Sequence, residues 1–409
     1  MIRWRPDYRL TARPTETPFP ARWGLLLRPP DVIFTAPPRP GRDGRTWPGF
    51  RDAPEGTGDS HLQEAIRDHL FGYQQAFAHP LSVTIVVGVL VGLAVSGTLI
   101  VALRRRISET SYGDAFRRWR SWCWLVGVIF VPVLAGALWT MLAVMVLSLL
   151  CFREYARATG LFREKTICAV VVLGIILVTF AAVDHWQDDV LFFALGPLVG
   201  ALIVIVGIPA DRPKGFIQRV ALGVLGFALL GYSLGYISNM ANVANLGRTG
   251  IDYRPLILLL IVAVELNDLL AALIGRTLGH KPILPETNPR KTWGGAIGAA
   301  VLTTSLVAVA GGWLFQGTPV AEPGWLIGLG LLISLLGQLG DLTLASIKRD
   351  VGIEDVGATL PGHGGLLDRF DGLVLVPPAV YHYLSLALGD SGPLGSEGPH
   401  RILTGGWGG

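Results

Sequence analysis

Ten long apolar stretches between residues 81 and 389 constrain the fold of this chain more than any other feature. A helix of roughly 20 apolar residues crosses the hydrocarbon core of a bilayer, which is about 30 Å thick. The third stretch is short, and the sequence does not separate it sharply from the second. We expect about ten transmembrane helices, at residues 81–103, 121–138, 140–152, 166–183, 189–208, 217–238, 255–275, 293–315, 324–346 and 372–389.

The composition agrees with a membrane protein. Hydrophobic residues make up 51% of the chain, charged residues only 16%, and the mean hydropathy is +0.50. A net charge of +4 would suit a nucleic-acid partner, but the Lys and Arg residues form short clusters between apolar stretches, where they act as topology signals. We therefore predict an all-α, polytopic membrane protein that has no nucleic-acid partner.

Charge alternates between successive loops. Five loops are basic, among them "RRRISETSYGDAFRRWR", "DRPKGFIQR" and "GRTLGHKPILPETNPRK". The intervening loops, such as "VDHWQDDV" and "QGTPVAEPG", carry little or no Lys or Arg, although "SNMANVANLGRTGIDYR" contains two Arg residues. The positive-inside rule makes the basic loops cytoplasmic, which leaves both termini outside.

The sequence divides into five parts. Residues 1–59 are rich in Pro, Arg and Gly without an apolar period, which predicts a disordered tail or a mis-assigned chain start. Residues 60–80 open with a capping box and place apolar residues on one face, which predicts an amphipathic interfacial helix or a soluble packing helix. We expect an N-terminal transmembrane bundle at 81–250, a catalytic transmembrane region at 251–390 and a flexible tail at 391–409.

Ionisable side chains within membrane spans are costly and therefore informative. Glu265 and Asp268 in "VELNDLLAALIGRTLGHK" lie three residues apart and share a helix face. One of these carboxylates could instead be satisfied by a neighbouring helix. Arg290 and Lys291 in "TNPRKTWGG" could likewise be a simple positive-inside anchor beside an interfacial Trp.

A third stretch, "GQLGDLTLASIKRDVGIEDVGATLPGHGGLLDRFDGL", carries the largest group of ionisable residues. Asp341 lies within the ninth predicted span, and Lys348 and Arg349 follow within two turns. Asp368 and Asp371 should share one face at the start of the tenth predicted helix. All three stretches open on the predicted cytoplasmic side, so we expect one site at the cytoplasmic face of the C-terminal helices.

The residue types in these stretches suit phosphate chemistry. Carboxylates at the ends of helices in a low dielectric repel one another unless a cation joins them, and oxygen ligands suit Mg²⁺. Lys291, Lys348 and Arg349 would supply charge for a polyphosphate, and the glycines around His363 let backbone N–H groups approach phosphate oxygens. Such a set predicts phosphoryl or nucleotidyl transfer. His363 could serve as a general acid, a phosphate contact or a structural group, and Ser346 could contact phosphate or bond the carbonyl four residues before it.

The segment "SIKRDVGIEDVGATLPGHGGLLDRFD" resembles the signature of the phosphatidate cytidylyltransferases, also called CDP-diacylglycerol synthases. In that signature Ser-x-x-Lys-Arg is followed by a Lys-Asp pair, Pro-x-His-Gly-Gly and Asp-Arg-x-Asp. The segments "GDLTLASIKR", "NPRKTWGG" and "NDLLAALIGRTLG" are similar to other parts of the family pattern. The resemblance covers roughly residues 81–390.

The chain departs from the family pattern at three places. Glu354 stands where the family usually has Lys, Asn288 where it has Ser, and Leu269 and Leu270 where it has a small polar pair. A reversed charge beside a triphosphate site should matter. The departures are consistent with a divergent branch that has a different lipid acceptor or altered activity.

The resemblance implies transfer of CMP from CTP to phosphatidic acid in the bilayer. It implies that Asp341, Asp368 and Asp371 organise Mg²⁺ and that Lys291, Lys348 and Arg349 hold the phosphates of CTP. It also implies a homodimer and a monovalent cation such as K⁺ beside Mg²⁺. The remaining candidates for substrate binding are Asp268, Asn288, Thr292, Ser346, His363, Gly364, Gly365 and Arg369.

Other classes of protein remain open at this stage. Intramembrane carboxylates also mark ion and lipid transporters, but these usually show internal repeats and charges near the bilayer midplane. No repeat is visible here, and the charges gather in the C-terminal third, which favours an enzyme. An inactive scaffold is a further alternative. The Arg-rich, Lys-poor composition suggests a bacterial source and therefore the inner membrane, and the basic loops predict that the active site faces the cytoplasm.

Overall fold

The computed structural model describes residues 70–105, 109–184, 190–209, 211–246, 251–279, 281–353, 356–357 and 365–389. The predicted tails at 1–59 and 391–409 lie outside the described residues, as do Glu354, His363 and Gly364. Only the end of the predicted helix at 60–80 is described, where a short 3-10 helix, η1, covers Tyr73–Gln75.

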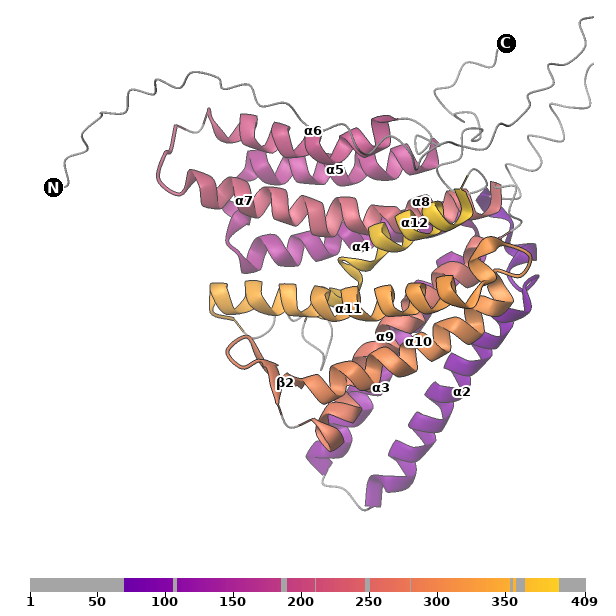
Figure 1. Ribbon diagram of the computed structural model, residues 1–409. Coiled ribbons are helices and arrows are strands. Elements are labelled where there is room, and N and C mark those ends of the chain that lie inside the picture. Colours follow the sequence, from indigo (N-terminus) through magenta and orange to yellow (C-terminus); the bar gives the residue numbers. More distant parts are fainter. Residues whose placement is uncertain are drawn as a thin grey trace, which may run out of the picture. The chain divides into compact units, whose positions relative to one another are not determined.

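The described chain is built mainly of helices (Figure 1). In chain order, the helices are α2 (Pro80–Ala102), α3 (Glu109–Ala135), α4 (Ala137–Ala158), α5 (Lys165–Val183), α6 (Val190–Gly207), α7 (Phe216–Gly226), the π-helix η5 (Phe227–Ser233), α8 (Leu234–Leu246), α9 (Tyr253–Leu278), α10 (Trp293–Leu314), α11 (Pro323–Val351) and α12 (Val376–Leu388). Four more short 3-10 helices are η2 (Leu103–Arg105), η3 (Leu161–Arg163), η6 (Pro319–Ala321) and η7 (Asp371–Leu373).

Seven of the predicted spans are confirmed as helices long and apolar enough to cross a membrane, which makes the chain a helical membrane protein. They are α2, α4, α5, the continuous α7–η5–α8 helix, α9, α10 and α11. Within the described residues, the other three predicted spans also form helices, but of a different kind. The first half of α3 is charged, the apolar segment Phe192–Gly207 of α6 is shorter than the seven helices above, and α12 has 13 residues.

The predicted tenth span at 372–389 is wrong in its start and its length. Helix α12 begins only at Val376, with Pro377 in its first turn, where a missing backbone N–H costs nothing. Its 13 residues reach about 20 Å at 1.5 Å per residue, less than the hydrocarbon core. Asp371 lies before it in η7, and Asp368 lies in the preceding turn. The expectation that Asp368 and Asp371 share one face of a helix is therefore wrong.

A short hairpin interrupts the all-α pattern between α9 and α10. Strand β1 (Pro282–Leu284) pairs antiparallel with β2 (Asn288–Thr292), with Pro282 opposite Thr292 and Leu284 opposite Asn288. The hydroxyl of Thr292 accepts a hydrogen bond of 3.3 Å from the Gly295 N–H and so caps α10. The hairpin thus fixes residues 288–292 directly before α10.

Helices α9, α10 and α11 pack around a buried polar cluster. The side-chain amide oxygen of Asn267, Oδ1, accepts hydrogen bonds from the hydroxyls of Thr303, at 3.2 Å, and Ser334, at 2.6 Å. The Gln338 amide donates to the Ala296 carbonyl and to Ser334, both at 3.2 Å. Because lipid offers no partner for such groups, the cluster joins the three helices in one register.

Helices α4 to α7 stack side by side in Figure 1, and α11 lies between this stack and the pair formed by α9 and α10. The interior of the stack is largely apolar, with fully buried Ile175, Ile203 and Phe227 among its members. Only small residues fit where the helices approach closely. A Cβ at Gly231, for example, would come within 2.8 Å of the Ile175 side chain.

Candidate active site

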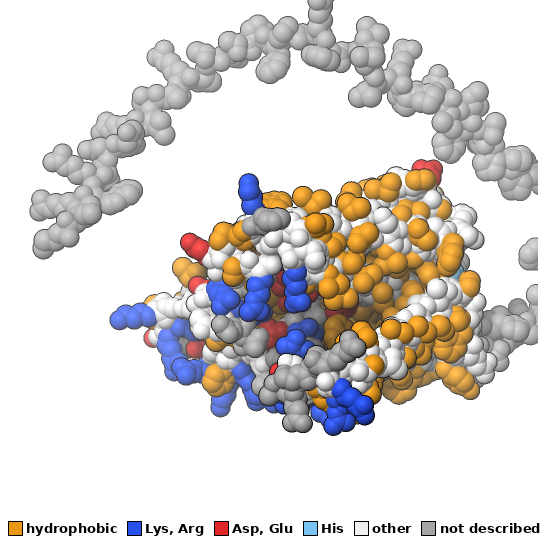
Figure 2. Space-filling model, turned by 90° about the horizontal axis from the view of Figure 1, so that it is seen from below, with side chains coloured by type: hydrophobic (Ala, Val, Ile, Leu, Met, Phe, Trp, Pro, Cys, Tyr) orange, Lys and Arg blue, Asp and Glu red, His pale blue; other side chains and the backbone are white. Residues whose placement is uncertain are grey.

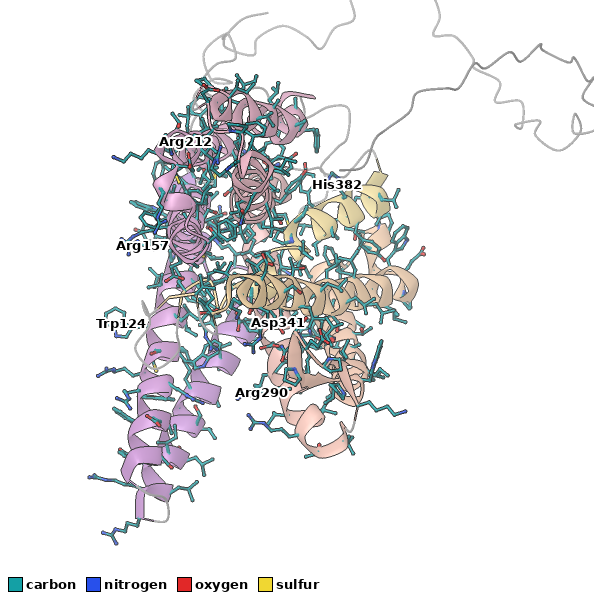
Figure 3. All side chains as sticks on the ribbon, turned by 90° about the vertical axis from the view of Figure 1, so that its left-hand side faces the viewer. Trp124, Arg157, Arg212, Arg290, Asp341 and His382 are labelled. Atoms are coloured by element: carbon teal, nitrogen blue, oxygen red, sulfur yellow. The ribbon has the colours of Figure 1, made fainter. Side chains whose placement is uncertain are left out.

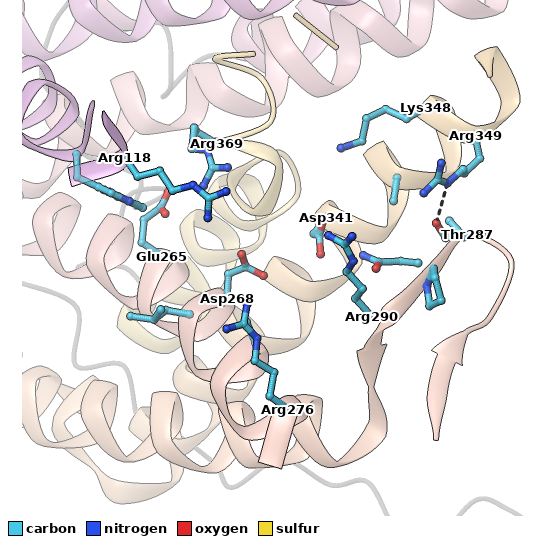
Figure 4. A pocket seen from close by; sticks show the side chains of 16 residues that line it. Arg118, Glu265, Asp268, Arg276, Thr287, Arg290, Asp341, Lys348, Arg349 and Arg369 are labelled. Carbon is cyan, nitrogen blue, oxygen red and sulfur yellow. Dashed lines mark hydrogen bonds between the residues drawn. The ribbon is translucent and has the colours of Figure 1, made fainter. Parts of the chain in front are cut away.

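A pocket of about 880 Å³ opens between α3, α9, the hairpin and α11 (Figure 4). Its lining is dominated by charged and polar side chains, unlike the rest of the helical surface. On the face seen in Figure 2, Lys and Arg side chains gather around a hollow in which carboxylates are visible. The lining comprises Arg118, Trp122, Glu265, Asp268, Leu269, Ala272, Arg276, Thr287, Asn288, Pro289, Arg290, Asp341, Ala345, Lys348, Arg349 and Arg369.

Lys291 joins two carboxylates at the base of this pocket. Its Nζ is ion-paired with Asp341, lies 3.9 Å from an Asp268 oxygen and donates a 3.5 Å hydrogen bond to the Gln338 carbonyl. The lysine is only 7% exposed. A buried ammonium group requires such partners, because its desolvation is otherwise costly. The structure therefore brings together three of the predicted residues, from α9, β2 and α11.

Asp371 belongs to the same group. Burial raises the pKa of its carboxyl group, the neighbouring carboxylates of Asp341 and Asp268 raise it further, and Lys348 lowers it. The turn approaches α11 closely at this point. A Cβ on Gly340 would come within 2.6 Å of the Asp371 carbonyl oxygen, so only glycine fits there without a shift of the backbone. Three carboxylates, on Asp268, Asp341 and Asp371, thus converge from α9, α11 and η7.

Asp368 has a different set of partners. One carboxylate oxygen accepts a 3.0 Å hydrogen bond from Lys348 Nζ, and the other accepts from the backbone N–H groups of Val356, at 3.1 Å, and Gly365, at 2.9 Å. Lys348 thus lies between Asp368 and the group around Asp371. Asp368 orders the turn and holds the lysine, while the other three carboxylates face one another.

The donor chemistry of the three converging carboxylates fits a hard cation. Among the described residues, no three His, Cys, Asp or Glu side chains are already arranged as a metal site, because lysines contact the carboxylates instead. Three carboxylates held together nevertheless create a negative potential, which adds to burial in raising the pKa of Asp371. Oxygen ligands of this kind suit Mg²⁺, and Asp268, Asp341 and Asp371 would be the residues to hold it.

Glu154 reaches the turn from the other half of the chain. This α4 residue is 7% exposed, and its Oε2 accepts a 2.9 Å hydrogen bond from the Leu367 N–H. A Cβ on Gly365 would lie 2.6 Å from Oε2, and one on Gly357 would lie 3.0 Å from Oε1. A side chain at either glycine would therefore have to push the Glu154 carboxylate aside.

The remaining predicted residues fall into two groups. Asn288, Arg349 and Arg369 line the pocket, and Arg349 Nε donates a 3.3 Å hydrogen bond to the Thr287 carbonyl. Thr292 caps α10, and the Ser346 hydroxyl donates to the Leu342 carbonyl at 2.9 Å. Neither of these two hydroxyl groups lines the pocket.

Sequence reasoning missed several contributors. Arg118 lies in the basic loop that predicts only topology, and Trp122 lies at the start of the predicted span 121–138, although α3 carries both into the pocket. Arg276 likewise lies in a basic loop. Glu154 could have been noticed as a carboxylate inside the apolar stretch "SLLCFREYARA". Figure 3 shows Arg290, on the hairpin, close to Asp341 on α11.

A family model described as the cytidylyltransferase family matches residues 116–387, which include every residue that lines the pocket. The chain is 31% identical over 282 residues to the uncharacterized protein YnbB of Escherichia coli strain K12. That match covers 68% of this chain and 90% of the relative.

Two further relatives have assigned names. The chain is 43% identical over 132 residues to the phosphatidate cytidylyltransferase of Brucella abortus, a match that covers 31% of this chain and 45% of the relative. It is 37% identical over 130 residues to the phosphatidate cytidylyltransferase of Mycobacterium bovis, which covers 32% of this chain and 40% of the relative. Both matches span less than half the length of these relatives.

Proposed function

Because the chain belongs to the cytidylyltransferase family of CTP-dependent nucleotidyltransferases, we propose that it transfers CMP from CTP to phosphatidic acid. The products would be CDP-diacylglycerol and pyrophosphate. The observation that carries this proposal is a charged pocket among membrane helices, lined by Asp268, Asp341 and Lys348. Next to it, Lys291 contacts the carboxylates of Asp268 and Asp341, and the buried Asp371 is close enough to feel the charges of Asp341, Asp268 and Lys348. Such a pocket can neutralise a polyphosphate at the depth of a lipid headgroup.

The proposed reaction needs no covalent protein nucleophile. An oxygen of the lipid phosphate attacks the α-phosphorus of CTP, and the bond from that phosphorus to the bridging oxygen breaks as pyrophosphate leaves. Arg290, Lys348 and Arg349 would hold the phosphates of CTP, because they line one side of the pocket (Figure 4). Lys291 would keep Asp341 oriented. Mg²⁺ bound by the three carboxylates would neutralise the charge that builds up on the phosphates.

We further propose that the pocket faces the cytoplasm of a bacterial cell, from the inner membrane. CTP is a cytoplasmic metabolite, and the basic residues Arg276, Lys348 and Arg349 lie in the last turns of α9 and α11, as the positive-inside rule expects of cytoplasmic helix ends. A homodimer and a monovalent cation such as K⁺ beside Mg²⁺ belong to the proposal through the family resemblance alone.

A second candidate is transfer of CMP to a different lipid phosphate. Glu354 favours it, because this acidic residue replaces the Lys that the family resemblance leads one to expect near the nucleotide. Reversal of that charge would weaken the attraction of the site for a phosphate group, and so could change which lipid phosphate it accepts.

One assay tests these proposals. Purified protein in detergent is given radiolabelled CTP, Mg²⁺ and either phosphatidic acid or another lipid phosphomonoester, and lipid-linked CMP is measured. We expect product with phosphatidic acid, its loss on addition of EDTA and its return with excess Mg²⁺. Product only with another acceptor would support the second candidate. The absence of product with every acceptor would contradict an enzyme and favour a transporter or an inactive scaffold.

A further inference from the structure

Two pockets meet at the first half of α3. Arg118 and Trp122 line the large charged pocket, and they also line a second pocket of about 460 Å³ between α2 and α3. From α2, the second pocket is lined by Leu93, Ser96 and Ile100, which share one face of that helix. Arg118 therefore lies where a charged cavity continues into a groove between two helices.

Arg118 and Arg369 lie on the same side of the charged pocket as Glu265 (Figure 4). Within the described part of the chain, neither arginine makes a hydrogen bond or an ion pair, although the Glu265 carboxylate interacts electrostatically with Arg369. Arg369 Nε is buried without an acceptor, whereas Arg118 is exposed. A buried guanidinium N–H without an acceptor is costly, and its fork of donors fits two oxygens of one phosphate. An oxyanion between the two arginines would satisfy these donors.

The groove between α2 and α3 suits an acyl chain. The most apolar 18-residue stretch of α2 contains no buried residue, although Leu81 and Ser82 at the start of the helix are buried. Much of this helix is therefore available to lipid. Gly97 leaves room for the Trp119 ring, to which a Cβ would come within 2.8 Å, and Trp119 Nε1 donates a 2.8 Å hydrogen bond to the Leu93 carbonyl. The two helices are thus held together beside an opening toward the bilayer.

We propose that Arg118 and Arg369 bind the phosphate of the lipid substrate and that one of its acyl chains lies in the groove between α2 and α3. This assignment rests on the proposed function, and it separates the two substrates. The lipid phosphate approaches from the α3 side, and the triphosphate occupies the opposite side near Arg290 and Arg349. The carboxylates of Asp268 and Asp341 lie between the two groups of cations (Figure 4), where the bond to the α-phosphorus would form.

A lipid phosphate fits this position better than a nucleotide phosphate. The groove next to Arg118 is bordered by Leu93, Ile100 and two tryptophans, which offer apolar surface to a hydrocarbon chain. Arg290 and Arg349, near the hairpin, line the larger pocket and do not border this groove. The two adjoining pockets therefore suit a ligand that carries both a phosphate and a hydrocarbon chain.

The test compares Arg118→Gln with Arg120→Gln, which removes the same charge from the same helix but does not line either pocket. Apparent KM values are measured for phosphatidic acid in mixed micelles and for CTP. Loss of a charged hydrogen bond should raise the KM for phosphatidic acid about tenfold or more in Arg118→Gln, while the KM for CTP stays unchanged. Arg120→Gln should behave as the wild type. An unchanged KM for phosphatidic acid, or a rise for CTP instead, would overturn the assignment.

A second variant tests the groove. Ser96→Phe fills the space between α2 and α3, so the KM should rise for long-chain phosphatidic acid and remain unchanged for a water-soluble short-chain form. Equal effects on both forms would contradict an acyl chain in this groove.

A binding measurement separates this inference from the proposed function. Native mass spectrometry of the detergent-solubilised protein counts bound phosphatidic acid, with phosphatidylcholine and glycerol 3-phosphate as comparison ligands. Selective binding of phosphatidic acid that is lost in Arg118→Gln supports the lipid site even if no transferase product forms. Binding that survives the substitution excludes it, whatever the transferase assay gives.

Discussion

Two regions of the protein are built from similar apolar helices but bury different side chains. One is the helix stack, which here includes η5 and α8 because they continue α7, and the other is the group α9–α11. Most of the buried residues in the stack are apolar, as at Ile175 and Phe227. The second group buries a connected polar cluster around Asn267 and Gln338, with Lys291 beside it. Polar groups are expensive in a membrane protein unless they serve packing or function. The difference indicates that the stack supports the fold and that α9–α11 carries the chemistry.

Glu154 connects the two regions. It belongs to α4, yet its carboxylate accepts a hydrogen bond from the turn that holds Asp368 and Asp371. The catalytic region is therefore not independent of the stack, because one buried carboxylate of the stack fixes the turn.

The largest expected effect on turnover is that of Asp341→Asn. This substitution removes a carboxylate from the proposed Mg²⁺ group and the ion-pair partner of Lys291, and turnover should fall on the order of a thousandfold. The Mg²⁺ concentration required for activity should also rise. Product formation is measured against Asp350→Asn, an exposed residue of the same helix that should have no effect.

Asp368→Asn sharpens this prediction. Asp368 contacts Lys348 and the backbone of the turn, and it lies apart from the three converging carboxylates. Turnover should therefore fall without a change in the Mg²⁺ requirement. An increase in that requirement as large as in Asp341→Asn would place Asp368 in the metal site.

Glu154→Ala should have the next largest effect, although Glu154 lies outside the catalytic region. Its loss leaves the buried Leu367 N–H without this acceptor, which costs about 1–3 kcal/mol and loosens the turn. Turnover should fall roughly tenfold to a hundredfold. Glu154→Gln, which keeps a carbonyl oxygen, should recover much of it.

The control for Glu154 is Glu164→Ala. Glu164 precedes α5, and its partly buried carboxylate lies 3.6 Å from Arg219 Nε, far along the chain from the turn that Glu154 contacts. If Glu164→Ala and Glu154→Ala reduced turnover equally, the effect would be a general loss of stability, and the positioning role of Glu154 would be refuted.

Replacing the two buried asparagines should distinguish the regions by stability. Asn267→Leu removes the acceptor of Thr303 and Ser334, so the apparent unfolding midpoint in detergent should fall by about 5 °C or more, with a severalfold loss of turnover. Asn239→Leu in α8 replaces an amide that makes no hydrogen bond within the described structure, so it should be neutral or stabilising. If Asn239→Leu lowered the unfolding midpoint as much as Asn267→Leu, the proposed difference between the two regions would be contradicted.

The smallest effect on turnover is expected for Ile175→Ala, in the centre of the stack. The residue is 1% exposed, and its truncation should cost about 2–5 kcal/mol of stability. Turnover per folded molecule, measured below the unfolding midpoint, should not change. A marked loss at that temperature would show that the stack takes part in catalysis beyond Glu154.

Several features of the fold and the site were predictable from the sequence. Six of the seven confirmed spans follow from the length of their apolar stretches, because the thickness of a bilayer sets the number of residues that a spanning helix needs. The seventh, α4, is longer than the short stretch 140–152 that predicted it. Asp268, Lys291 and Asp341 stood out as ionisable residues next to such spans, and they do meet in one pocket. The predicted start of the tenth span is wrong. Its apolar composition does not reveal that the first residues form the 3-10 helix η7 and that α12 begins only at Val376, next to a proline.

The sequence by itself determined which residues could carry the chemistry, and the tertiary structure decided how they are grouped. Helical period predicted that Asp368 and Asp371 act as a pair, but the turn directs Asp371 toward Asp341 and Asp368 toward Lys348. Contacts such as Glu154 with Leu367, and the position of Arg118 at the pocket, join residues more than 200 positions apart along the chain. Local periodicity cannot encode such distances, because they depend on how separate helices pack against one another.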